Sequence, residues 1–242
     1  MTQGHWVALF GVTLVFWAVL FLMALPETLL ASQGLGWLEA LCRVTPGTAG
    51  IPTAVFMWSV MSAAMMAPTA LPAFSTFDDL PGTTPVELSQ LIAGYLAVWI
   101  GFAAAAGALQ VALFQAGWLG LFGQSQSLWL TALLLGLAGL YQFSALKEAC
   151  LSRCRAPLAF FMSHWGEGAF RNGLRLGADC LGCCWALMLL AFVGGTMNLA
   201  FMGLAMVLMT LEKLPEIGGH ITRPLGAGLI ALAVLTPFSL LF

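Results

Sequence analysis

Charged side chains are scarce in this chain, and they make up only 7% of its 242 residues. Soluble domains carry about 25%. The eight Lys and Arg residues form no basic stripe, which excludes nucleic acid as a partner. Only three histidines occur, widely spaced, so haem ligation is weakly provided for. The chain is instead 61% hydrophobic with a mean hydropathy of +0.97, which predicts an integral membrane protein in contact with a lipid bilayer.

Apolar stretches of about 20 residues recur along the chain, and each is long enough to cross a bilayer as a helix. They predict an all-α fold, a polytopic transmembrane helix bundle forming a single integral membrane domain over residues 1–242. Seven spans are expected, at about 6–25, 52–71, 90–114, 128–146, 177–193, 197–213 and 223–241. The Gly194-Gly195 pair favours a hairpin within 180–213. If 180–213 is one long helix instead, the count is six.

Basic residues concentrate in the loop that follows the fourth expected span. Five of the eight lie there: Lys147, Arg153, Arg155, Arg171 and Arg175. The positive-inside rule predicts that this loop is cytoplasmic, and with seven spans the N-terminus is cytoplasmic as well.

Five of the six cysteines flank that same loop. Cys180, Cys183 and Cys184 open the fifth span, and Cys150 and Cys154 precede the loop. On helices, the i, i+3, i+4 and i, i+4 spacings place each set on one face. Adjacent cysteines and thiols at these helical spacings are awkward to bridge, so a disulfide framework is the weaker interpretation.

Further soft donors are expected at the same membrane surface, and they suggest a metal site. Thiolates and thioethers select Cu(I), with zinc as the alternative and an iron–sulfur cluster less favoured. The predicted metal ligands are Cys150, Cys154, Cys180, Cys183, Cys184, Met65, Met66 and His164. The plainer interpretations are that the methionines fill the core and that His164 is a polar interfacial residue. Glu212-Lys213 is expected to be a local ion pair, or, if buried against the thiols, to supply a ligand or proton carrier.

Several motifs resemble a bacterial membrane family, the predicted metal-binding integral membrane proteins of domain of unknown function 2182. They are Met61-x-x-Ala64-Met65-Met66-x-Pro68, Ala138-Gly139-x-Tyr141-Gln142, Leu146-Lys147-x-x-Cys150-Leu151-x-x-Cys154-Arg155-x-Pro157, Gly177-x-x-Cys180-Leu181-Gly182-Cys183-Cys184-Trp185, Gly194-Gly195-x-Met197-Asn198 and Glu212-Lys213. The resemblance implies a metal-linked role in the bacterial inner (cytoplasmic) membrane. The family commonly has His where this chain has Leu176.

The leading functional hypothesis is binding of a thiophilic metal, copper before zinc, for handling or delivery to a membrane metalloenzyme. One alternative is a membrane oxidoreductase that uses the metal or a dithiol, which a quinone or haem bound between spans would support. Another is a structural subunit of a larger membrane complex, in which the cysteines only staple helices. Unchanged partner activity after Cys180→Ser would support that last hypothesis.

Overall fold

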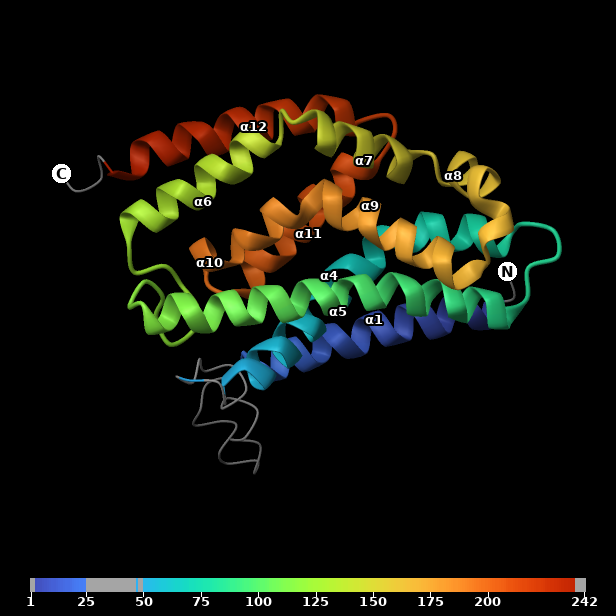
Figure 1. Ribbon diagram of the computed structural model, residues 1–242, viewed down its shortest axis with the longest axis horizontal. Coiled ribbons are helices and arrows are strands. Elements are labelled where there is room, and N and C mark those ends of the chain that lie inside the picture. The colour runs from blue at the N-terminus through green and yellow to red at the C-terminus, as the bar shows by residue number, and fades with distance from the viewer. Residues whose placement is uncertain (1–2, 25–46, 48–49, 238–242) are drawn as a thin grey trace.

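The computed structural model describes residues 3–24, 47 and 50–237, and these residues form helices joined by turns (Figure 1). The longer helices are α1 (Gln3–Met23), α4 (Gly50–Asp78), α5 (Pro85–Gln115), α6 (Leu128–Tyr141), α9 (Ala169–Leu189), α11 (Leu199–Lys213) and α12 (Gly218–Leu235). The shorter ones are α7 (Ala145–Arg155), α8 (Pro157–His164) and α10 (Ala191–Gly194), with a 3-10 turn at Trp165–Glu167. The all-α prediction is confirmed.

Four segments are long and apolar enough to cross a membrane: α4, α5, α9 together with α10, and α12. A fifth arises if α6 and α7, which meet at a bend of 62°, form one broken span. These segments confirm a multi-span helical bundle. The expected spans 6–25 and 197–213 coincide with helices α1 and α11, which are not among these segments, so the count of seven stays a prediction. Several boundaries differ from the expected ones: α4 continues to Asp78, α6 already ends at Tyr141 and α9 begins at Ala169.

The chain turns back between α9 and α11. Gly195 has a φ of +89°, which side chains rarely tolerate, and the Asn198 side chain caps α11 by accepting from the Phe201 amide at 3.1 Å. Lys213 Nζ lies 3.0 Å from Cys180 Sγ, whereas one straight helix would separate these residues by about 50 Å. The hairpin interpretation is therefore correct, and Figure 1 shows α11 running back towards α7.

Glycines bring α5 and α9 into close contact. A Cβ on Gly173 would lie 2.1 Å from the Leu91 carbonyl oxygen, and one on Gly94 would lie 2.2 Å from that of Phe170. Small residues at such crossings let two backbones approach closely. The crossing fixes the neighbouring Tyr95 against the middle of α9, where Cys180 lies.

Substituting Gly173 by Ala is expected to destabilise the fold by about 1–3 kcal/mol, because the added methyl group has only backbone to displace. The matched control is Gly101→Ala on α5, where a Cβ meets nothing within 4 Å. Thermal unfolding of the purified protein measures both. Equal melting temperatures for the two variants would contradict the close crossing.

Pro68 interrupts the hydrogen bonding of α4 beside Met65 and Met66. Proline has no N–H, so the carbonyl of Ala64, four residues earlier, loses its helical donor. The Trp17 indole of α1 donates to this carbonyl at 3.1 Å instead. The proline thus leaves no unpaired carbonyl at Ala64, and α1 is attached to α4 at the level of the methionines.

Candidate metal centre

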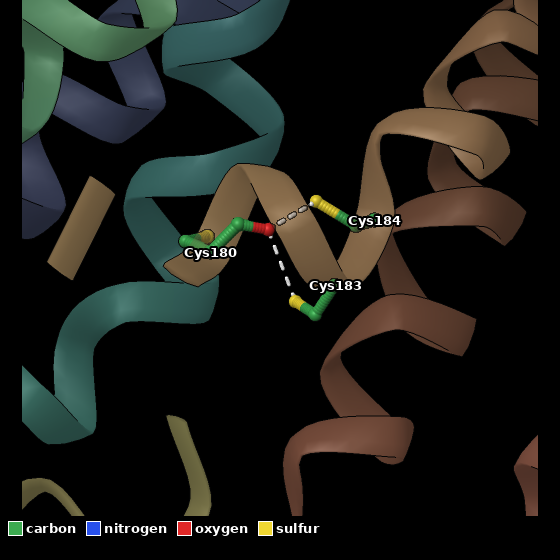
Figure 2. Close-up of side chains that lie close together, drawn as sticks. All are labelled: Cys180, Cys183 and Cys184. Atoms are coloured by element: carbon green, nitrogen blue, oxygen red, sulfur yellow. Dashed lines mark hydrogen bonds between the residues drawn. The ribbon is translucent and has the colours of Figure 1, made fainter. Parts of the chain in front are cut away.

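Three thiols of α9 lie together inside the bundle. The sulfur atoms of Cys180, Cys183 and Cys184 are all within 4.8 Å of one another, and each residue is 2% exposed. Figure 2 shows Cys183 and Cys184 turned towards the carbonyl oxygen of Cys180, to which they donate at 3.0 and 2.9 Å. The predicted helical face is confirmed, and we call these residues the three-thiol group.

The spacing of the three-thiol group suits a thiolate-bound metal ion. Metal–sulfur bonds of about 2.3 Å allow two ligating sulfurs to be up to about 4.6 Å apart. The sulfurs therefore need only small side-chain movements to share an ion. Ligation also requires the thiols to lose their protons, which breaks the two bonds to the Cys180 carbonyl.

Cys180 has two polar partners from other helices. Lys213 Nζ lies 3.0 Å from its sulfur and also donates to Thr69 Oγ1 at 2.7 Å. The Tyr95 hydroxyl lies 3.0 Å from the same sulfur and donates its proton to the Met66 carbonyl at 3.0 Å. The ammonium of Lys213 would stabilise negative charge on Cys180, such as a metal-bound thiolate carries.

The local ion pair expected within Glu212-Lys213 was wrong. Lys213 contacts Cys180 and Thr69, and Glu212 pairs with Lys147 at 2.8 Å, with side chains 2% and 1% exposed. Adjacent helical residues point about 100° apart, so they readily take different partners. Sequence reasoning missed Tyr95 and Thr69 altogether, because an isolated Tyr or Thr in an apolar helix gives no signal of its tertiary partner.

The two methionines predicted as ligands lie in different surroundings. Met66 Sδ is 3.7 Å from Cys184 Sγ, which places a thioether beside the three-thiol group. Met65 lines a separate cavity of about 10 Å³ together with Met61, Met188 and Met202.

The two α7 thiols lie at the edge of the three-thiol group. Cys150 Sγ would be 2.6 Å from a Cβ on Gly182. Cys154 lies beside the Cys183 thiol. The five cysteines thus converge from two helices, α7 and α9, as the sequence predicted.

Three contacts hold the bend between α6 and α7 over this part of α9 and α11. Arg153 pairs with Asp179 at 2.8 Å, and the Tyr141 hydroxyl donates to the Gly182 carbonyl. Arg155 donates twice to the Glu212 carbonyl, at 3.0 and 2.8 Å. Side-chain contacts therefore attach the α6–α7 bend to both halves of the hairpin, α9 and α11.

His164, the predicted imidazole ligand, is engaged within its own helix. Its Nδ1 lies 2.9 Å from the Phe160 carbonyl oxygen and 2.8 Å from Ser163 Oγ. The side chain lines a hollow of about 280 Å³ that Arg153 and Asp179 also border.

A larger pocket of about 290 Å³ reaches the three-thiol group directly. Its wall includes Cys180, Cys154, Lys213, Arg155, Thr69 and Tyr95. The residues that surround Cys180 are therefore accessible through a hollow between α4, α5, α7, α9 and α11.

A protein-family model described as PpoB2, copper chaperone, matches residues 55–236, about three-quarters of the chain. The chain belongs to the PpoB2 copper chaperone family. Neither a curated protein nor a solved structure matches it. The matched range of this PpoB2 family member contains the three-thiol group, Met66 and Lys213. Membership agrees with the copper handling that the thiolate and thioether donors predicted, and with the metal-linked role that the motif resemblance implied.

Proposed function

We propose that this PpoB2 family protein is a bacterial inner-membrane copper chaperone that binds one Cu(I) at the three-thiol group and delivers it to a membrane metalloenzyme. The observation that carries the proposal is the clustering of three buried thiols within 4.8 Å of one another. The family match and the four helices long enough to cross a membrane support it. So does the motif resemblance to the predicted metal-binding membrane family.

The donors around the group favour Cu(I) over Zn(II). Structural zinc sites close a tetrahedron with Cys or His, whereas Cu(I) accepts soft thioethers. The donor that contacts Cys184 is the thioether of Met66. Cu(I) on three thiolates carries a net charge of −2, and the ammonium of Lys213 beside Cys180 offsets part of it.

A zinc staple between helices has less support. Cys180, Cys183 and Cys184 all belong to α9, so an ion held by them alone would join α9 to itself. The helices around the group are held by other contacts, among them Lys147–Glu212 and Arg153–Asp179. A site that does not hold helices together is better suited to a metal ion that is bound and then released.

The test is anaerobic purification followed by metal quantification by mass spectrometry. We expect about one copper per protein and little zinc, as a soft donor set selects. Stoichiometric zinc without copper would overturn the proposal. A reporter fusion at residue 170 tests the orientation, and a periplasmic readout would contradict the cytoplasmic placement of the site.

The Met66→Leu substitution is expected to weaken Cu(I) affinity about tenfold, the loss typical of a supporting metal contact, while hardly changing the packing volume. Met65→Leu is the matched control, because Met65 lines the separate methionine cavity. Competition with a chromophoric Cu(I) chelator measures both affinities. Equal affinities for the two variants would contradict a role of Met66 in copper binding.

A further inference from the structure

The pocket beside the three-thiol group has the size and composition of a binding site. Its volume of about 290 Å³ is near the lower end of small-molecule pockets, which begin at about 300 Å³. Two thiols from different helices, Cys154 of α7 and Cys180 of α9, lie in its wall. Four prolines also line it, at positions 68, 72, 157 and 215. A ligand in this pocket would meet both the partly exposed thiol of Cys154 and the buried thiol of Cys180.

The charge of the pocket favours an anion. Lys213 and Arg155 line it, and no Asp or Glu is among its lining residues in the described part of the chain. Glu212 pairs with Lys147, and Arg155 donates to the backbone carbonyl oxygen of Glu212. The carboxylate of Glu148 lies 3.7 Å from Arg155 and is 67% exposed, so it offsets only part of that charge. Free Cu⁺ would be repelled by Lys213, which contacts Thr69 and Cys180 rather than a carboxylate, and in part by Arg155, whereas an anionic complex would be attracted.

We propose that the pocket receives incoming copper as an anionic, low-molecular-weight thiolate complex of Cu(I), and that Cys154 is the first protein thiol to bind it. This inference rests on the proposed function. Two small thiolates on Cu(I) give a net charge of −1 at the metal, which matches the cations of the pocket. Cys154 borders the pocket and lies beside Cys183, so it connects the carrier to the three-thiol group.

The transfer is a series of ligand exchanges without a redox step. Cys154 sulfur forms a bond to copper while one carrier sulfur leaves, and the thiol proton of Cys154 passes to the released carrier thiolate. Cys183 then displaces Cys154, which takes back a proton from Cys183, and Cys180 displaces the second carrier thiolate, which leaves with the Cys180 proton. Cys184 adds as the third ligand and releases its proton to water, so copper stays Cu(I) while its coordination number rises from two to three.

The first test uses full-length protein loaded anaerobically with Cu(I)–glutathione, a thiolate complex, or with Cu(I)–acetonitrile, which carries no negative charge. Cys154→Ser is expected to slow loading from Cu(I)–glutathione about tenfold, because a hydroxyl is a poor ligand for Cu(I), while final copper content stays unchanged. Cys150→Ser, the other α7 thiol, lies outside the pocket lining and is the matched control. Unchanged loading in Cys154→Ser would overturn the first-acceptor role.

The second test changes the charge of the pocket at its exposed rim. Leu214 lines the pocket and is 37% exposed, so Leu214→Glu and its neutral match Leu214→Gln should both fold. Leu214→Glu is expected to slow loading from Cu(I)–glutathione about threefold to tenfold relative to Leu214→Gln, less so at high salt, because the added carboxylate repels the anion. Loading from Cu(I)–acetonitrile should not slow.

Two results separate the outcomes of these tests. Equal loading rates for the two Leu214 variants would overturn the carrier proposal. Inhibition of wild-type loading by anionic lipid would also overturn it, and would assign the pocket to a lipid headgroup. Copper binding from acetonitrile would then still stand as evidence for the chaperone function. Absence of copper binding from either source would overturn the chaperone function and this inference together.

Discussion

Replacing Cys180, Cys183 and Cys184 together by serine is expected to abolish copper binding. Serine preserves the size of each side chain but replaces a soft thiolate by a hard, neutral hydroxyl. After anaerobic loading and removal of free metal, copper should fall from about one per protein to near zero, since three metal–sulfur bonds supply most of the binding free energy. Mass spectrometry of the desalted protein measures the change.

The control for this variant is Cys150→Ser. Cys150 is also a buried cysteine, but its sulfur packs against Gly182, and the three-thiol group does not include it. We expect Cys150→Ser to retain full copper content. Loss of copper in both variants would show that the site extends to α7 as the sequence first predicted, and retention in both would place it elsewhere.

Lys147→Met is expected to have the largest effect on stability, lowering the free energy of unfolding by about 3–5 kcal/mol. The Lys147–Glu212 pair is 2.8 Å long and almost fully buried, and Glu212 Oε1 has no hydrogen-bond partner. Removing the ammonium leaves a buried carboxylate without its cation. Thermal unfolding in detergent, monitored by circular dichroism, measures the loss.

The double variant Lys147→Met with Glu212→Leu is the control for the buried pair. Because both charges are removed together, it should recover most of the stability lost in the single variant. If Lys147→Met were as stable as the wild type, that result would contradict a stabilising ion pair between Lys147 and Glu212. A double variant less stable than the single one would show that Glu212 contributes through a contact other than Lys147.

Local properties of the fold could be predicted from the sequence, since they depend on residues near one another in the chain. Apolar runs gave the positions of the helices, and Gly194-Gly195 indicated the turn before α11. The i, i+3, i+4 spacing placed Cys180, Cys183 and Cys184 on one helical face. These parts of the site needed no knowledge of the tertiary structure.

The polar partners of the site could not be predicted, because they depend on how the helices are rotated and spaced. Tyr95 reaches Cys180 only because Gly94 and Gly173 let α5 and α9 come close. Lys213 and Thr69 are 144 residues apart in the chain. One signal was present: a Lys or Glu at the end of an apolar segment must find a partner when buried. Lys147, Glu212 and Lys213 all do so.

Copper K-edge X-ray absorption on the anaerobically loaded protein tests the central claim most directly. A Cu(I) edge with a first shell of sulfur only, at about 2.3 Å as for metal–thiolate bonds, is predicted, together with loss of that shell when Cys180, Cys183 and Cys184 are serine. A first shell of nitrogen or oxygen, or a sulfur shell that survives the triple substitution, would contradict copper binding at the three-thiol group.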